Sequence, residues 1–309
     1  MSNIVVVTFY KFFDFTDCRE RRVPIQTVCD ENGIKGTILL ATEGINSTIA
    51  GTREGIDTVL HYLREDPRLA DLTWKESYHD EIPFYRMKVK VKREIVSLGM
   101  PEVNPNKKKV GTYVPPQEWN TVISDPEVLV IDTRNSFEYQ VGTFQRAVNP
   151  HTKSFREFPT YVQQELDPQK YKKVAMFCTG GIRCEKATAY MLENGFEQVY
   201  HLQGGILQYL ADVPEEESLW QGECFVFDER VSVDHHLKKG VYELCYGCHH
   251  PLTPADRQSP HYEEGVCCPY CHDTLSEDKK ARARERQKQI RLAKERGETH
   301  IGRRFEPSK

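Results

Sequence analysis

A short apolar run that ends in a cysteine and two glycines constrains this chain more than any other feature. Residues 174–177 are apolar and read as a buried strand, and Cys178 follows directly. Gly180 and Gly181 permit a tight turn, and residues 185–193 have helical character with a glycine stop signal behind them. The segment predicts an α/β layer in which Cys178 lies between the carboxyl end of a strand and the amino end of a helix.

Similar short strands surround this segment. The runs at 128–132 and 199–202 alternate with helices, which predicts a mainly parallel α/β domain over residues 119–213. Residues 1–100 follow the order β-α-β-β-α-β, with the last strand at 84–92 and an extra strand at 73–78. This order is typical of a ferredoxin-like domain.

The remaining segments differ in composition. Residues 101–118 are rich in Pro, Asn and Lys and read as a linker. Residues 214–309 form a Cys-rich segment followed by a basic helix from Glu277 to about Arg296. The expected fold class is therefore a multidomain protein with α+β and α/β parts. No apolar run could span a bilayer and no signal peptide is recognisable, so we expect a cytoplasmic protein without a membrane partner.

The loop after Cys178 is suited to hold an anion. Backbone N–H groups of the turn and the positive end of the helix would lower the pKa of Cys178, and Arg183 adds a cation. The loop residues are Thr179, Gly180, Gly181 and Ile182. A thiolate nucleophile is one interpretation, and a structural cysteine at a strand end is the other. Cys184 fits either a resolving thiol or a small core residue.

Three motifs occur in the order and spacing of the rhodanese superfamily. They are Asp132-Thr133-Arg134 with Glu138, the loop 178–183, and the run 202–206. This resemblance implies that Cys178 carries the reaction, often as a persulfide, and that the Asp-x-Arg motif is mainly structural. In the related phosphatases the arginine stands six residues after the cysteine, where this chain has Cys184, so the loop resembles the shorter sulfur-handling type.

A second group of cysteines has the spacing of a zinc site. Cys245 and Cys248 form one C-x2-C knuckle, Cys268 and Cys271 form another, and 19 residues separate the two. Four thiolates would close a structural site, whereas unbound reduced thiols are the alternative. Further candidate ligands leave the set open: Cys267, His249, His250 and His272.

The charge distribution indicates a polyanionic partner. The net charge is -4, but residues 277–309 carry +6, so the rest of the chain carries -10. Basic side chains that could follow a phosphate backbone are Lys88, Lys90, Lys92, Lys107, Lys108, Lys109, Arg282 and Arg286. On charge alone a solvated helix explains the basic tail equally well, and an ordinary exposed face is the better interpretation of any single basic element.

Taken together, the motifs along residues 3–296 resemble bacterial tRNA uridine hydroxylases of the rhodanese superfamily (the TrhO family). The resemblance rests on the stretches 36–41, 43–46, 178–187 and 222–228 and on the double knuckle with the run 281–289. It implies oxygen-dependent conversion of a wobble uridine in tRNA to 5-hydroxyuridine, with Cys178 essential. Cys267 departs from the family pattern. The residues alone indicate a cysteine-dependent rhodanese-like enzyme, for which RNA is one candidate substrate.

Two other functions fit the sequence. A sulfurtransferase would pass a Cys178 persulfide to tRNA or to a carrier, and a non-catalytic RNA-binding module would use the fold as a scaffold. The intact loop argues against the scaffold, because a scaffold does not need Cys178. For hydroxylation, thiolate addition to C6 of uracil would make C5 nucleophilic toward oxygen. No flavin, haem or iron motif is visible, and the sequence leaves the reductant and the oligomeric state open.

Overall fold

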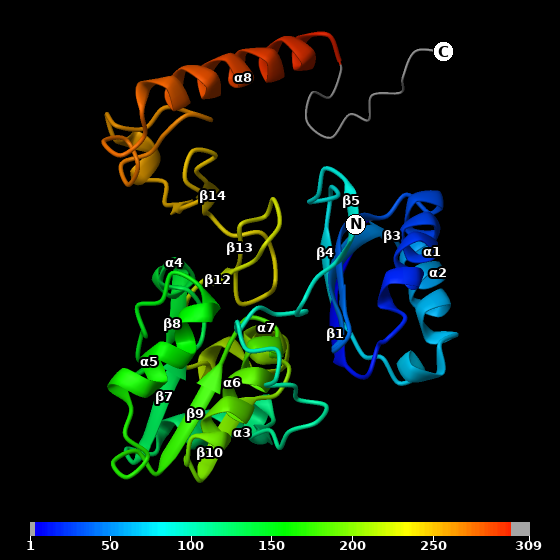
Figure 1. The fold of residues 1–309 in the computed structure, drawn as a ribbon. Helices are drawn as coiled ribbons and strands as arrows, with labels where there is room; N and C mark the ends of the chain where they lie inside the picture. Colours follow the sequence, from blue (N-terminus) through cyan, green and yellow to red (C-terminus); the bar gives the residue numbers. More distant parts are fainter. Residues whose placement is uncertain (1–3, 298–309) are drawn as a thin grey trace. The chain divides into compact units, whose positions relative to one another are not determined.

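The computed structural model describes residues 4–297, which form two compact units. The first unit contains the residues up to Val226 together with Val233–Lys239. The second contains Phe227–Ser232 and the residues from Gly240 on. Figure 1 shows the elements of both units. Every helix within residues 4–297 is too short or too polar to cross a lipid bilayer.

The N-terminal domain is a five-stranded sheet in the order β4-β1-β3-β2-β5, with α1 and α2 on the same face (Figure 1). The amphipathic helix α2 buries Ile56, Val59, Leu60 and Leu63, and the Thr52 side chain caps its first turn. This helix confirms the helical spacing in the sequence. The elements are β1 (Ile4–Phe12), α1 (Cys18–Glu31), β2 (Lys35–Ala41), β3 (Gly44–Thr52), α2 (Arg53–Arg64), β4 (Lys75–His79) and β5 (Met87–Val91).

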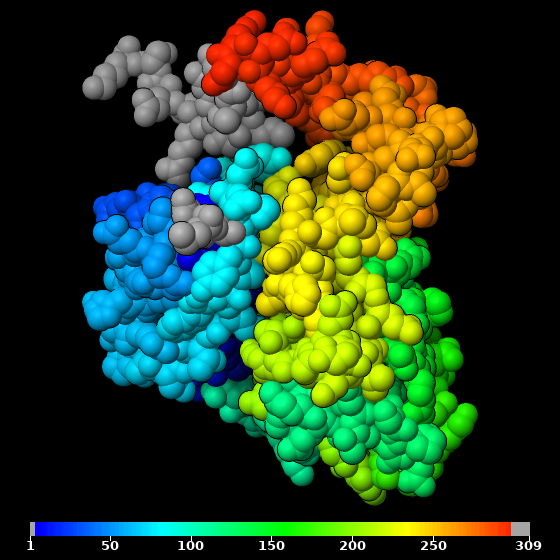
Figure 2. Space-filling view, turned by 180° about the vertical axis from the view of Figure 1, so that it is seen from behind, coloured from blue at the N-terminus to red at the C-terminus, as the bar shows by residue number. Residues whose placement is uncertain are grey.

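The strand that closes the ferredoxin-like unit is β4, and not the strand predicted at 84–92. β4 pairs antiparallel with β1, whereas β5 joins the outside of β2 in parallel. Alternating Val and Lys residues identified β5 correctly as a strand, but alternation does not say which strand is its neighbour. Tyr78 and Tyr85 are exposed. Figure 2 shows the surface of the N-terminal domain, coloured blue to cyan.

The central domain is a four-stranded parallel sheet in the order β6-β10-β9-β7. The strands are β6 (Thr112–Val114), β7 (Val128–Asp132), β9 (Lys173–Phe177) and β10 (Gln198–Leu202). The helices are α3 (Pro116–Ser124), α4 (Ser136–Val141), α5 (Phe158–Glu165), α6 (Ile182–Glu193) and α7 (Gly205–Asp212). The buried strands confirm the mainly parallel α/β layer. β6 lies within the segment assigned to the linker, so the end of that segment belongs to the sheet.

Residues after α7 complete the core of the central domain. β11 (Trp220–Gly222) pairs antiparallel with β8 (Gly142–Phe144), and Trp220 packs its ring against Phe144. Cys224 is buried in the same cluster. The segment assigned to the Cys-rich region from residue 214 on therefore begins with residues that pack on the sheet.

The second unit is small and built around the cysteine knuckles. β14 (Glu243–Leu244) pairs antiparallel with β15 (Pro251–Leu252). The helix α8 (Glu277–Glu295) confirms the charged helix expected from the sequence. The basic residues beyond Gly297 lie outside the described residues.

Candidate active site

Cys178 lies in the turn that joins β9 to α6. Its side chain is buried, and the Gly181 N–H donates to its Sγ at 3.2 Å. Gly181 has a φ of 99°, in the left-handed region that favours glycine. A Cβ at Gly181 would come within 2.9 Å of the Tyr10 hydroxyl. Glycine is therefore required both by the turn and by the close approach of Tyr10.

The surroundings of Cys178 stabilise its thiolate form. Burial alone would raise the pKa of Cys178, but a hydrogen bond from Cys184, the charge of Arg183 and backbone N–H groups lower it to about 6. Burial and the Cys178 thiolate raise the pKa of Cys184 well above its usual value. At neutral pH the negative charge resides on Cys178, as expected for a nucleophile.

Arg183 is engaged by a buried carboxylate. Its two Nη atoms donate to the two oxygens of Glu138, each at 2.7 Å, and Nη2 also lies 3.3 Å from Thr179 Oγ1. Glu138 is fully buried; burial would raise its pKa, but Arg183 lowers it. The charge of Arg183 is thus balanced by Glu138, and the pair fixes the loop to the start of α4.

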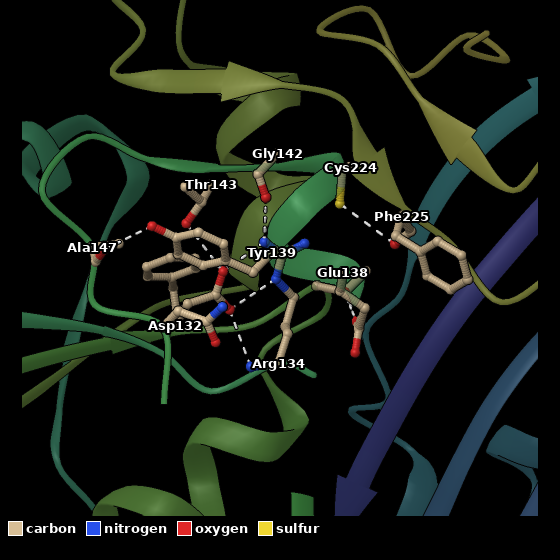
Figure 3. A network of polar contacts seen from close by, with 12 residues as sticks. Asp132, Arg134, Glu138, Tyr139, Gly142, Thr143, Ala147, Cys224 and Phe225 are labelled. Atoms are coloured by element: carbon tan, nitrogen blue, oxygen red, sulfur yellow. Dashed lines mark hydrogen bonds and ion pairs between the residues drawn. The ribbon is translucent and has the colours of Figure 1, made fainter. Parts of the chain in front are cut away.

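The Asp-x-Arg motif forms a separate buried network (Figure 3). Arg134 donates from Nε to Asp132 Oδ1 at 2.9 Å and from Nη2 to Asp132 Oδ2 at 2.6 Å and the Gly142 carbonyl. Thr143 donates to Asp132 at 3.1 Å. These contacts join β7 to β8 and do not reach the loop thiol, so they hold the scaffold together.

Thr133, the middle residue of this motif, links the scaffold to the loop. Its Oγ1 donates to the Phe177 carbonyl at 2.9 Å and lies 3.7 Å from Cys184 Sγ. The end of β9 and the first turn of α6 are therefore held by the same side chain.

The N-terminal domain contributes side chains to the loop that the sequence analysis did not identify. Lys75 donates from Nζ to the Gly180 carbonyl at 3.4 Å. Tyr10 of the N-terminal domain donates to one oxygen of Glu185 at 3.0 Å, and Tyr113, on β6 of the central domain, donates to the other at 2.7 Å. Burial raises the pKa of Glu185 above its usual value despite these two donors. No local pattern links Tyr10 or Lys75 to a loop more than 100 residues away.

A buried ion triad lies next to the loop. Lys186 is fully buried, and its Nζ contacts Glu43 at 2.8 Å and Glu94 at 2.7 Å. Both carboxylates also accept backbone N–H groups, from Ile95 to Glu43 and from Leu98 and Gly99 to Glu94. The sequence holds one signal for this triad: Glu185 and Lys186 are charged residues directly before a mostly small or apolar stretch, residues 187–191, which the structure shows to be buried.

A cavity of about 630 Å³ lies within the first unit, and one of its lining residues, Lys75, contacts the loop at the Gly180 carbonyl. Its walls include five aromatic residues, Tyr10, Trp74 and Tyr113 among them, together with Glu185. Such a cavity has the size and the mixed aromatic and polar lining of a small-molecule or nucleotide site.

The four knuckle cysteines converge in the second unit. Their Sγ atoms all lie within 4.8 Å of one another, and three pairs are separated by 3.7 to 3.8 Å. Four thiolates around a tetrahedral zinc, with bonds of about 2.3 Å, have sulfurs about 3.8 Å apart. The cluster could hold a metal ion, and its geometry is consistent with zinc. Cys267 is not part of it, because its Sγ points to the His261 carbonyl at 3.6 Å.

The structure places the predicted RNA-binding residues on several elements. Lys88 and Lys90 are exposed on β5, and Lys92 directly after it. Lys107 pairs with Asp14 at 3.3 Å, Lys108 with Glu193, and Lys109 is exposed.

On α8, Arg282 and Arg286 are both exposed, and each donates to a backbone carbonyl at 3.3 Å, Arg282 to Asp278 and Arg286 to Gly265. Within residues 4–297 neither is paired with a carboxylate, so both are more available to a phosphate than Lys107 or Lys108, which form ion pairs.

Comparisons with known families agree with this architecture. Residues 4–95 match the UPF0176 acylphosphatase-like domain, and residues 116–212 match the rhodanese-like domain. The chain therefore contains a rhodanese-like domain. In particular, it joins a UPF0176-type N-terminal domain to a rhodanese-like domain and carries a cysteine cluster behind them.

Solved structures give weaker likenesses. The rhodanese-like domain of the Anabaena sp. Alr3790 protein is 16% identical, with 36% of this chain and 78% of that chain covered and a TM-score of 0.30. A rhodanese-related protein from Thermoplasma volcanium is 19% identical, with 33% and 93% covered and a TM-score of 0.27. The BLUF protein BlrB is 18% identical, with 35% and 88% covered and a TM-score of 0.28. With TM-scores of 0.27 to 0.30, these likenesses do not contribute to the assignment of the domains.

Proposed function

We propose that this protein is a tRNA-modifying enzyme that hydroxylates a wobble uridine to 5-hydroxyuridine, using molecular oxygen and the thiolate of Cys178. The observation that carries the proposal is the loop itself. Cys178 has a pKa of about 6 at a strand–helix turn, and Lys75, which contacts the Gly180 carbonyl of this turn, also lines a cavity wide enough for a nucleotide. The enzyme would act in the cytoplasm.

The chemistry requires a nucleophile that can add and leave. In the proposed route the Cys178 thiolate forms a bond to C6 of uracil, and the electron pair of the C5–C6 double bond moves toward O4 as an enolate. C5 then takes one oxygen atom from O2. The second oxygen atom leaves as water with two electrons and two protons from an external reductant. Loss of the C5 proton and of the thiolate restores the double bond and frees Cys178.

The cavity supports a nucleotide substrate. Tyr10, Trp74 and Tyr113 offer ring faces on which a base can stack, an interaction worth about 1–3 kcal/mol per base. An anticodon loop is single-stranded, so its bases can leave the stack at low cost. Exposed basic residues such as Lys90 and Arg282 would add sequence-independent attraction to phosphates.

The cysteine cluster would have a structural role in this enzyme. Cys245, Cys248, Cys268 and Cys271 would hold one zinc ion, which supplies folding energy to the small second unit. Four thiolates leave no open position for substrate, so the residues of the knuckles take no part in the proposed reaction.

Sulfur transfer is the second candidate function, because the rhodanese-like domain and the low pKa of Cys178 suit a persulfide equally well. A non-catalytic RNA-binding role is disfavoured by the same pKa, since binding alone does not need a stabilised thiolate.

Nucleoside mass spectrometry of tRNA from a deletion strain tests the proposal. Hydroxylation predicts the loss of 5-hydroxyuridine and its derivatives, with thionucleosides unchanged. Loss of a thionucleoside instead would favour the sulfurtransferase. Unchanged amounts of both would contradict a catalytic role in tRNA.

A further inference from the structure

We infer that Lys75 of the N-terminal domain is a positioning residue of the active site, whose ammonium stabilises the thiolate of Cys178 across the domain boundary within the first unit. The inference deepens the proposed function and rests on it only in taking Cys178 as the reacting thiol. It also gives the N-terminal domain a chemical role, because a rhodanese-like domain alone would lack this charge.

The other cations near the loop are already balanced. Arg183 is paired with Glu138 through both carboxylate oxygens. Lys186 is paired with Glu43 and Glu94. Arg183 lowers the pKa of Cys178, but it shares its charge with Glu138, and Lys186 shares its charge with Glu43 and Glu94.

Lys75 differs from these residues. Among residues 4–297, no carboxylate lies within ion-pair distance of its Nζ, whose polar contact is the Gly180 carbonyl. The same cavity wall offers a comparison, because Lys11 also lines it but is paired with Asp71 and donates to the Arg68 carbonyl at 2.7 Å. Lys75 is the cavity cation whose charge is not cancelled by a neighbour.

The fold directs Lys75 to the loop. Lys75 begins β4 and pairs in register with Thr8 of β1, which places it beside Tyr10, two residues further along. Its Nζ lies 6.0 Å from the Tyr10 ring centre, and its Cε would lie 3.1 Å from a Cβ at Gly204. The side chain therefore runs between the two glycine turns that flank Cys178.

Charge and burial act together on this lysine. Burial lowers the pKa of Lys75, while the negative charge of Cys178 raises it, so the two groups stabilise each other's charged form. Burial and the negative charge of Cys178 raise the pKa of Glu185, so an ionised Glu185 would oppose the thiolate. Burial and nearby negative charges raise the pKa of Tyr10 well above its usual value, so Tyr10 stays neutral beside Cys178. The charged and titratable groups that face Cys178 are Tyr10, Lys75, Arg183, Cys184 and Glu185. Glu138 acts on Cys178 through its ion pair with Arg183.

A direct test is the pH dependence of Cys178 alkylation in the full-length protein. Iodoacetamide is used in excess, and modification of Cys178 and Cys184 is separated by peptide mass spectrometry. Lys75→Met removes the charge and keeps the length of the side chain, so the pH midpoint of Cys178 alkylation should rise by about one pH unit, which makes the reaction roughly fivefold slower at pH 6. Lys75→Arg should keep the midpoint near that of the native protein, and Lys11→Met is the matched control from the same cavity.

A midpoint that stays the same in folded Lys75→Met would overturn the inference. A reciprocal measurement covers the case in which that variant does not fold. Removing the thiolate by Cys178→Ser should lower the pKa of Lys75, measured by competitive acetylation with acetic anhydride. An unchanged pKa of Lys75 would equally contradict the inference. Neither measurement uses tRNA, so a failure of the proposed hydroxylation would remain distinguishable.

Discussion

The guanidinium of Arg183 donates to both carboxylate oxygens of Glu138, each at 2.7 Å, in a fully buried setting. This pair ties the loop of Cys178 to α4, whose first turn Glu138 also caps by accepting the Asn135 N–H at 3.0 Å. The arginine of the loop therefore shapes the site and supplies a charge that Glu138 balances.

Glu138→Gln should destabilise the protein, because it leaves a buried guanidinium without its counter-charge. Breaking a buried pair in this way costs about 3–5 kcal/mol of unfolding free energy. Urea unfolding followed by fluorescence measures the loss. The exposed Glu165→Gln, at the end of α5, is the control and should change the free energy of unfolding by less than about 0.5 kcal/mol. Equal stability of the two variants would show that the pair contributes little.

Lys186→Met should also destabilise the fold, and by an amount that depends on pH. Burial raises the pKa of Glu43. The contribution of Glu43 to the free energy of unfolding is therefore greatest at low pH, where its carboxyl is protonated, and is lost as the pH rises through the pKa that Glu43 has in the folded state. Without Lys186 that pKa rises further, because the cation that lowered it is gone. We expect a loss of about 3–5 kcal/mol at pH 7 and a smaller loss at pH 5.

Thermal and urea unfolding at both pH values measure this difference. Lys153→Met, an exposed lysine of the same domain, should show no difference between the two pH values. If Lys186→Met lost the same free energy at pH 5 and pH 7, the buried carboxylates would not be the cause.

The sequence predicted the local features of the site and missed the distant ones. The turn at Cys178 and the spacing of the knuckles follow from neighbouring residues, and the structure shows both. The contacts of Lys75 and Tyr10 with the loop could not be predicted, because nothing within a strand indicates which domain its side chains will meet. The same limit affected β4 and β5, whose alternation identified strands but not their neighbours in the sheet.

The cysteine cluster should bind about one zinc per chain. Elemental analysis of protein purified without chelators measures it. Cys268→Ser removes one of the four converging sulfurs and should lower the zinc content strongly, whereas Cys267→Ser should leave it unchanged, because the Cys267 sulfur points to the His261 carbonyl. If zinc were lost in Cys267→Ser but kept in Cys268→Ser, Cys267 and not Cys268 would be the fourth zinc ligand.

Binding to tRNA should weaken steeply with salt if Lys90 and Arg282 contact phosphates. Each lost phosphate contact reduces the slope of log affinity against log salt by about 0.7–0.9. Lys90→Gln and Arg282→Gln should each lower the slope by about one such step, measured by filter binding between low and moderate salt. Lys172→Gln, at an exposed position outside the predicted set, is the control. Unchanged slopes would place the phosphate contacts on other residues.

The central claim is that Cys178 performs the chemistry, and Cys178→Ser tests it most directly. The substitution is nearly isosteric, so the loop should keep its shape, but the hydroxyl stays protonated where the thiol is ionised. Cells without the native enzyme are complemented with the native chain, Cys178→Ser or Cys184→Ser, and 5-hydroxyuridine in their tRNA is quantified by mass spectrometry. The account predicts no 5-hydroxyuridine with Cys178→Ser and a reduced amount with Cys184→Ser, at equal protein levels. A native amount with Cys178→Ser would contradict it.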